Sequence, residues 1–167
     1  MNLRPEGSIV IGIGELGATS RNGESIRTHA LGSCVAVIFM DPKTRTVSMA
    51  HVALPDSGIS SAKAKENPGH FADTAVPALV EAMQKHGYQG TGKGLIVKLV
   101  GGAQIVDPNN VFNIGKRNVL AIKKALWVRA MGAVAEDVGG VLSRTVSVDV
   151  EGGKVVISTP GKPDREI

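Results

Sequence analysis

The sequence contains one cysteine, few aromatic residues and no long apolar run, and each shortage excludes a class of protein. With Cys34 as the only cysteine, no internal disulfide is possible, as is usual in a reducing compartment. No stretch approaches the roughly 20 apolar residues of a membrane span, and no signal-like segment opens the chain, so we expect a cytoplasmic protein without membrane insertion. Aromatic residues make up 3% of the chain, which leaves few stacking platforms, so we expect no nucleic-acid partner.

Metal-ligand pairs and a nucleotide-binding site are also missing from the pattern. One cysteine and four scattered histidines show no spacing typical of zinc, so we expect neither a metal nor a cofactor. Gly12-x-Gly14-x-x-Gly17 matches the dinucleotide-binding fingerprint. The residues that follow do not predict a helix, however, and without a helix N-terminus the motif lacks its phosphate-binding part.

The length and composition predict one compact domain over residues 1–167. A chain of this size with 43% hydrophobic residues buries a sizeable core without disulfides or metals. Its 21 glycines indicate many tight turns between short strands. Residues 158–167, rich in proline and charge, are expected to form a loose C-terminal tail.

The apolar patterns predict a mixed α/β fold of α+β type, in which strands outnumber helices. Strands are expected at 8–12, 25–30, 34–40, 46–54 and 93–100, with a terminal hairpin formed by 146–150 and 154–157. Helices are expected at 71–86, kinked or divided by Pro77, and at 115–131. Residues 57–69 read as a loop. His70 and His86, at the edges of the first helix, are expected to be solvated.

Cys34 is the strongest candidate for chemistry. A thiol is a good nucleophile once a base or a positive neighbour helps it to ionise. The Gly32-Ser33 pair before it allows a sharp turn that would present the sulfur where a strand begins. A lone cysteine is more often a small buried hydrophobic residue, so both interpretations stay open on this evidence.

A predicted hairpin brings a histidine to this cysteine. Asp41-Pro42 favours a type I turn, and if Asp41 and Thr44 are the last facing pair, the numbers of facing residues sum to 85. Cys34 then lies directly opposite His51, with Cβ atoms about 4.5–5.5 Å apart. A register shift of one residue would send the two side chains to opposite faces.

Several ordered motifs then resemble a known family, from about Ile9 to Ile157. The segments that carry the resemblance are Thr28-x-x-Leu31-Gly-Ser-Cys34, Ala50-His51-x-x-Leu54-Pro55, Val100-Gly-Gly-Ala103 and Asn113-Ile-Gly-Lys-Arg-Asn118. They resemble the chemoreceptor glutamine deamidase family, CheD. The resemblance implies a layered sandwich of mainly antiparallel sheets flanked by helices, akin to the cytotoxic necrotizing factor-type cysteine deamidases.

The resemblance also implies an enzyme, a protein-glutamine glutaminase. Its substrates would be glutamine side chains in the cytoplasmic domains of chemoreceptors (methyl-accepting chemotaxis proteins), which it would convert to glutamate with release of ammonia. Cys34 would be the nucleophile, His51 its base and Thr28 the residue that orients the imidazole. Backbone N–H groups of Cys34 and of the Gly32-Ser33 turn are expected to stabilise the oxyanion. His29, next to Thr28 on a strand, is expected to point to the opposite face.

Two other functions remain open at this point. The chain could be a binding module for the CheC-type CheY-phosphate phosphatase, which the resemblance implies as a partner, or a cysteine amidase or peptidase with another substrate. Five basic residues lie on the second predicted helix with no acid among them: Lys116, Arg117, Lys123, Lys124 and Arg129. Such a face is usually only solvated, but it would also attract an acidic partner such as a receptor helix.

Overall fold

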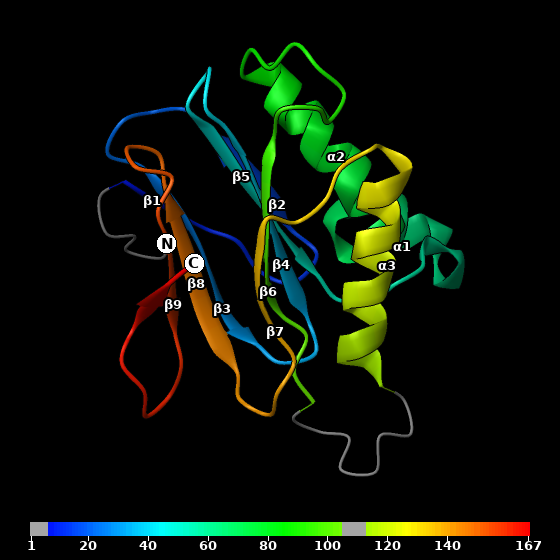
Figure 1. Ribbon diagram of the computed structural model, residues 1–167. Coiled ribbons are helices and arrows are strands. Elements are labelled where there is room, and N and C mark those ends of the chain that lie inside the picture. The colour runs from blue at the N-terminus through cyan, green and yellow to red at the C-terminus, as the bar shows by residue number, and fades with distance from the viewer. Residues whose placement is uncertain (1–6, 105–112) are drawn as a thin grey trace.

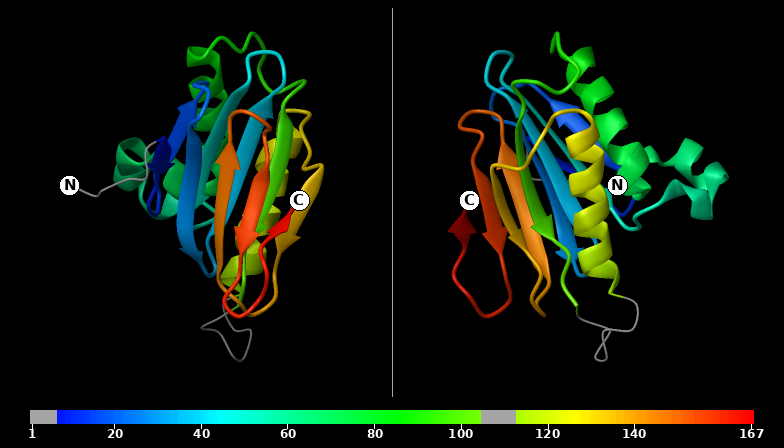
Figure 2. Two further views of the ribbon diagram at one scale, coloured as in Figure 1. Left: turned by 90° about the vertical axis from the view of Figure 1, so that its left-hand side faces the viewer. Right: turned by 45° about the vertical axis from the view of Figure 1, so that its right-hand side comes forward.

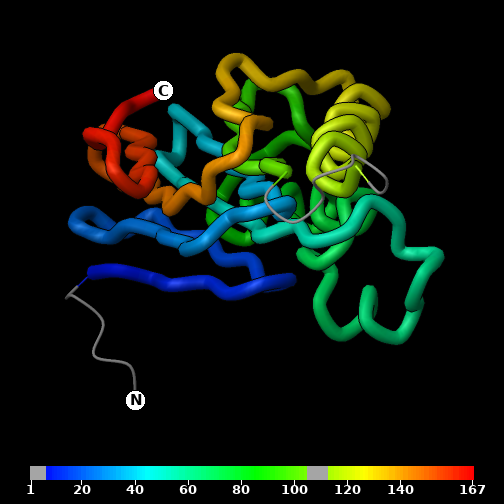
Figure 3. The backbone as a smooth tube through the Cα atoms, turned by 90° about the horizontal axis from the view of Figure 1, so that it is seen from below, coloured from blue at the N-terminus to red at the C-terminus, as the bar shows by residue number. Residues whose placement is uncertain are grey.

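The computed structural model, which describes residues 7–104 and 113–167, has two five-stranded mixed sheets and few helices. Figure 1 shows three layers, with one sheet at the left, the other in the middle and the long helices α2 and α3 at the right. Seen from below in Figure 3, the C-terminal segment and α3 lie at opposite sides of the molecule. The predicted α+β class is confirmed, with helices against one of the two sheets rather than both.

The sheet at the left of Figure 1, called the outer sheet, has the strand order β1-β3-β8-β9-β10. Its strands are β1 (Ser8–Val10), β3 (Ser25–Leu31), β8 (Arg144–Asp149), β9 (Val155–Ser158) and β10 (Arg165–Glu166). The pair β1–β3 is parallel and the other pairs are antiparallel. The predicted terminal hairpin is confirmed as β8–β9.

The middle sheet, called the central sheet, has the strand order β2-β5-β4-β6-β7. Its strands are β2 (Leu16–Thr19), β5 (Thr46–Val52), β4 (Val35–Asp41), β6 (Ile96–Gly101) and β7 (Ala135–Val138). Only β6–β7 is parallel among its pairs, so antiparallel pairing dominates both described sheets.

Two hydrophobic clusters hold these layers together, one on each face of the central sheet. Between the sheets, Ile26 and Val146 of the outer sheet pack with Ile38 and Met49 of the central sheet. On the other face, Phe39 and Leu99 pack with residues of α2 and α3. Every residue of β4 is buried, because alternate side chains enter opposite clusters. This explains the unbroken apolar run of that strand.

The helices are α1 (Ser61–Glu66), α2 (Ala72–Lys85) and α3 (Ile114–Val128), with two 3-10 turns, η1 (Ser57–Ile59) and η2 (Pro68–His70). Helix α2 is one element that runs through Pro77, so the expected division does not occur. Residues 57–69, expected as a loop, contain η1, α1 and the first two residues of η2. Figure 2 shows α2 and α3 side by side against the central sheet.

The β4–β5 hairpin forms, but with a register two residues away from the predicted one. Asp41 pairs with Thr46, so His51 lies opposite Ala36 and not opposite Cys34. The connection is longer than expected because the N–H of Arg45 donates to the carbonyl of Asp41 at 2.8 Å, with Arg45 in the left-handed region at φ 58°. A shift of two residues keeps every side chain on its predicted face, since the strand period is two.

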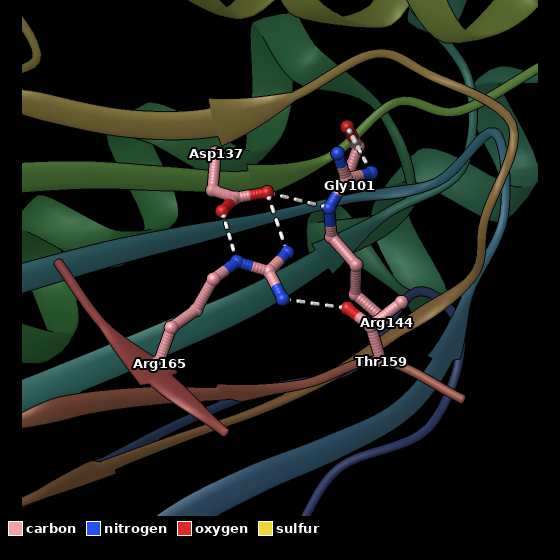
Figure 4. Close-up of polar contacts among 5 residues, drawn as sticks. All are labelled: Gly101, Asp137, Arg144, Thr159 and Arg165. Carbon is pink, nitrogen blue, oxygen red and sulfur yellow. Dashed lines mark hydrogen bonds and ion pairs between the residues drawn. The ribbon is translucent and has the colours of Figure 1, made fainter. Parts of the chain in front are cut away.

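The C-terminal residues are ordered, contrary to the loose tail expected for 158–167. Strand β10 pairs with β9, and Arg165 donates to both carboxylate oxygens of Asp137 in β7, at 2.6 and 3.0 Å. Arg144 donates to the same carboxylate at 2.7 Å and to the carbonyl of Gly101 at 3.3 Å. Figure 4 shows these contacts, together with the bond from Arg165 to Thr159. One carboxylate therefore connects strands from both sheets.

Hydrogen bonds from Arg165 hold the pKa of Asp137 below its ordinary value. The hydrogen bond and the charge of Arg144 lower this pKa too, whereas burial raises it. A depressed carboxyl pKa means that the folded state favours the charged form. The resulting stability is present above the ordinary pKa and is lost as the pH falls through the lower, folded value.

We therefore expect Asp137→Asn to lower the free energy of unfolding by about 1–3 kcal/mol near pH 7, because two guanidinium groups lose their charged acceptor. The difference from the wild type should shrink as the pH falls below the ordinary carboxyl pKa of 3.8. Urea denaturation between pH 7 and pH 3 measures both effects. Glu81→Gln, which removes an exposed pair with Lys85, is the matched control and should change stability much less. Equal losses in the two variants would contradict a special role for Asp137.

Candidate functional site

The chain passes from one sheet to the other at the candidate nucleophile. Strand β3 of the outer sheet ends at Leu31 and β4 of the central sheet begins at Val35, so Gly32, Ser33 and Cys34 form the whole connection. The predicted turn before the cysteine is therefore present. Cys34 is half-buried and packs against the cluster between the two sheets.

Three consecutive carbonyl groups of this connection are held by hydrogen bonds. The carbonyls of Gly32 and Cys34 accept from the backbone N–H groups of Ala103 and Gly102, at 2.7 and 2.8 Å. The carbonyl of Ser33 accepts from the Nδ2 atom of Asn118 in α3, at 2.9 Å. The end of β6 and helix α3 thus fix the backbone around Cys34.

Close packing of backbone on backbone explains the Gly101-Gly102 pair after β6. A Cβ atom on Gly101 would lie 2.3 Å from the carbonyl oxygen of Cys34, and Gly101 has a φ of 121°. Any other residue would clash with the cysteine backbone and strain its own. The pair therefore lets β6 approach the candidate nucleophile.

Thr28 and His51 are in direct contact although they belong to different sheets. The Oγ1 atom of Thr28 in β3 lies 2.7 Å from Nδ1 of His51 in β5, and both side chains are buried. The hydroxyl of Thr28 also donates to the carbonyl of Ile11 at 2.8 Å. A hydroxyl has one proton to donate, so towards His51 it acts as the acceptor.

This hydrogen-bond arrangement determines the imidazole tautomer. Nδ1 carries the proton that Thr28 accepts, and Nε2 is left with its lone pair. Nε2 is buried and has no hydrogen-bond partner among the described residues. An unprotonated, unpartnered ring nitrogen is what a general base needs before its substrate arrives.

The backbone of His51 is held by the glycine-rich segment that resembled a nucleotide-binding motif. The N–H of Gly14 donates to the carbonyl of His51 at 2.8 Å, and the N–H of His51 donates to the carbonyl of Glu15 at 3.0 Å. The residues after this segment form β2, a strand, so no helix N-terminus is present there. The segment positions the histidine instead.

The surroundings of the two candidate residues favour their neutral forms. Burial lowers the pKa of His51 to about 4, nearby His70 lowers it too, and Glu15 acts in the opposite direction. Burial raises the pKa of the Cys34 thiol above its ordinary value. His70 itself is buried against Phe71, with ring centroids 4.9 Å apart, and not solvated as expected.

Cys34 and His51 share a face of the central sheet without lying directly opposite each other. Continuing the β4–β5 register by one pair would place Cys34 opposite Ala53, which makes His51 its diagonal neighbour. Diagonal neighbours in an antiparallel pair have Cα atoms about 7–8 Å apart, within reach of long or aromatic side chains. The even register shift therefore keeps both side chains on one face of the sheet, although His51 is no longer directly opposite Cys34.

A cavity of about 320 Å³ opens beside Thr28 and His51. It is also lined by Ile11, Glu15 and His29, whereas Cys34 is outside this lining. His29 is exposed while Thr28 is buried, which confirms that the two neighbours point to opposite faces.

Sequence reasoning assigned no role to Asn118, although it lies in one of the motifs that carried the resemblance. Its side chain is fully buried, and Nδ2 donates to the carbonyl of Ser33 and, at 3.0 Å, to the carbonyl of Ala53 after β5. The sequence does offer one signal for this role. Asn118 is a polar residue beside Val119 and Ile122 on the buried face of an amphipathic helix, where a polar side chain needs hydrogen-bond partners.

The basic residues predicted on one helix lie on α3, except for Arg129 at its C-terminal cap. Lys123 is paired with Glu136 and Arg129 donates to the carbonyl of Thr91, so these two contact the protein itself. The exposed face of α3 also carries large apolar side chains, Leu120, Trp127 and Val128. A groove of about 660 Å³ runs between this face and α2.

The described residues contain neither a metal-binding cluster nor a helix that could cross a membrane. In the ranges 7–104 and 113–167, no group of three or more His, Cys, Asp or Glu side chains is placed to hold a metal ion. In the same ranges, none of the helices has the length and apolar character to cross a membrane.

Comparison with known proteins gives consistent matches. A family model described as "CheD chemotactic sensory transduction" matches residues 53–159. The "Probable chemoreceptor glutamine deamidase CheD" of Syntrophotalea carbinolica is 48% identical over 95% of this chain and 98% of its own length. The "Chemoreceptor glutamine deamidase CheD" of Thermotoga maritima is 44% identical over 91% of this chain and 92% of its own.

Among solved structures, the Bacillus licheniformis hypothetical protein YfiH matches with a TM-score of 0.45 and 12% identity, over 73% of this chain and 49% of its own. The likeness to cytotoxic necrotizing factor-type deamidases stays a prediction. The family model covers more than half of the chain, and the two relatives match it nearly end to end. The chain therefore belongs to the CheD family.

Proposed function

We propose that this protein is a glutamine deamidase that acts on chemoreceptors, with Cys34 as nucleophile, His51 as general base and Thr28 as the residue that orients the base. The observation that carries the proposal is the buried Thr28–His51 hydrogen bond, which leaves Nε2 unprotonated and without a partner on the face that Cys34 shares. The names of the relatives supply the reaction and the substrate class.

The first step forms a bond between sulfur and carbon. Nε2 of His51 takes the proton of the Cys34 thiol as the sulfur attacks the carboxamide carbon of a glutamine side chain. The carbonyl electron pair moves onto oxygen, and the resulting oxyanion needs hydrogen-bond donors already directed towards it. The backbone N–H groups of Ser33 and Cys34, in the fixed connection between the sheets, are the donors that we assign.

The second step expels ammonia. The oxyanion collapses, the carbon–nitrogen bond breaks, and protonated His51 gives its proton to the departing amine. A thioester between Cys34 and the substrate remains. Water then attacks this thioester while His51 accepts one of its protons, and collapse of the second tetrahedral intermediate returns the proton to sulfur. The net change is glutamine plus water to glutamate plus ammonia, and no cofactor is required.

We assign the histidine to general-base catalysis rather than to a preformed ion pair, because burial favours the neutral forms of both side chains. With the thiol pKa raised and the imidazole pKa lowered by burial, proton transfer in the free enzyme is unfavourable. Transfer becomes favourable as the sulfur bonds to carbon, because the thiol loses its basicity in that step. Thr28 then holds the positive imidazolium through its Nδ1–H.

An alternative role as a binding module for a CheC-type phosphatase stays a prediction from the family resemblance. An attraction between the basic face of α3 and an acidic receptor segment also stays a prediction. Both concern binding and not chemistry, so they are compatible with the proposed activity.

Cys34→Ala should abolish deamidation because no other thiol is present. Mass spectrometry of a purified receptor cytoplasmic domain, incubated with the enzyme, detects each glutamine-to-glutamate change as a gain of about one dalton. Co-purification of the variant with the receptor domain tests whether binding survives. An active Cys34→Ala variant would contradict the mechanism, and peptide cleavage by the wild type would favour a protease.

Thr28→Val should lower kcat on the order of 10- to 100-fold, because the isosteric side chain cannot accept the Nδ1 proton of His51. Thr28→Ser keeps the hydroxyl and should restore most of the activity. Thermal melting of both variants checks the fold, since Thr28 also donates to the carbonyl of Ile11. Full activity in Thr28→Val, or no rescue by serine, would count against an orienting role.

The acidic limb of the kcat/KM profile should fall near pH 4 and not near 6.5. His51 must be neutral to accept the thiol proton, and its pKa is lowered to about 4, so protonation removes the base only below that pH. Initial rates between pH 3.5 and 8 measure the limb, and circular dichroism at each pH confirms that the enzyme is folded. A limb centred near pH 6.5, the ordinary histidine value, would show that burial does not lower the pKa of His51 in the working enzyme.

A further inference from the structure

We infer that Asn118 is a positioning residue that directs the backbone N–H of Cys34 towards the substrate oxygen. The inference rests on the proposed deamidase mechanism, in which that N–H is an oxyanion donor. It concerns a residue of α3, an element that carries none of the three residues assigned to the reaction.

The argument begins with the planarity of the peptide group. In a trans peptide the C=O of one residue and the N–H of the next are fixed in one plane and point in opposite directions. The Ser33 carbonyl and the Cys34 N–H belong to the same peptide group. Because Asn118 Nδ2 holds the Ser33 carbonyl at 2.9 Å, it also fixes the Cys34 N–H to point away from α3.

The neighbouring peptide group is held in the same way. The carbonyl of Gly32 accepts from the N–H of Ala103, which fixes the N–H of Ser33. Two successive N–H groups with fixed directions can stabilise an oxyanion when both face it. None of the described residues accepts a hydrogen bond from the Cys34 N–H, so this donor is free for a substrate oxygen.

The same amide group ties the nucleophile to the strand that carries the base. The second hydrogen of Asn118 Nδ2 goes to the carbonyl of Ala53, two residues after His51. One fully buried side chain thus holds the segment that contains Cys34 and the segment that follows His51 at a common distance from α3. An amide suits this position, since its one nitrogen carries two hydrogens, one for each carbonyl oxygen.

Burial makes this arrangement rigid. Asn118 has no exposed surface, so water cannot take the place of its amide in holding the Ser33 carbonyl. Without the amide, the Ser33–Cys34 peptide group loses the bond that opposes its rotation. A rotated group would present a carbonyl oxygen where the developing negative charge needs a donor.

The first experiment compares Asn118→Ala and Asn118→Asp with Ile122→Val, a buried control one turn further along α3. The two Asn118 variants should lose about 10- to 100-fold in kcat with KM changed less than about threefold, since a displaced donor affects the transition state more than binding. Alkylation of Cys34 by iodoacetamide at pH 9 forms no oxyanion, so its rate should be unchanged. The control should retain its kcat.

A second measurement keeps the inference testable if neither Asn118 variant folds. Because Cys34 is the only cysteine, ¹⁵N-cysteine labelling of the wild type gives a single backbone amide signal. A peptide whose glutamine side chain ends in an aldehyde should add the thiol, forming a carbon–sulfur bond and a hemithioacetal oxygen. The Cys34 amide proton should move downfield as it donates to that oxygen.

The outcomes separate this inference from the proposed function. A wild type that deamidates no receptor glutamine overturns the proposed function. An active wild type whose Asn118 variants keep full kcat, or lose kcat and alkylation rate together, overturns the positioning role. A Cys34 amide signal that does not move when mass spectrometry shows the hemithioacetal would overturn it as well.

Discussion

The site depends on the three-residue passage of the chain between two sheets. Packed sheets lie about 10 Å apart, and an extended residue spans about 3.3–3.6 Å, so a connection of Gly32, Ser33 and Cys34 has little slack. A short connection would still leave its peptide groups free to rotate. Hydrogen bonds to all three of its carbonyl oxygens remove that freedom. The position of the cysteine is thus set by sheet packing, and the direction of its backbone groups by the segment from β6 to α3.

The two sheets supply different parts of the site. The central sheet carries the buried His51, and the outer sheet supplies Thr28, whose hydroxyl contacts Nδ1 of the imidazole. The proposed base therefore has its hydrogen-bond partner only when the two sheets are packed together. The Asp137 carboxylate reinforces that packing, since it joins Arg144 of β8 and Arg165 of β10 to β7, the edge strand of the central sheet. Arg144 also reaches the carbonyl of Gly101, next to the glycine whose N–H holds Cys34. The C-terminal strand is in this way connected to the candidate site.

The residues of the site could be predicted from the sequence more reliably than their geometry. Period-two patterns placed Cys34 and His51 on one face, and this held because the real register differs by an even number of residues. The register itself depended on the Arg45 turn, where a non-glycine residue adopts a left-handed conformation that no composition rule predicts. The order of the C-terminal residues was missed for a related reason, since Arg165 finds Asp137 only through tertiary packing. Asn118 was missed because a polar residue beside the apolar face of a helix does not reveal its partners, which are backbone carbonyls of distant segments.

The burial that makes Cys34 and His51 neutral also bears on selectivity. A preformed thiolate would react with any electrophile or oxidant that reached it, in proportion to its ionised fraction. In this arrangement the thiol pKa is raised and the imidazole pKa is about 4, so the free enzyme contains little thiolate. In the proposed mechanism, reaction then requires a carboxamide placed against the sulfur, with its oxygen at the N–H groups of the connection between the sheets. Selection of the substrate and activation of the nucleophile would then be the same event. Burial disfavours charge in the free enzyme, and negative charge develops only on the substrate oxygen, where the N–H donors are already in place.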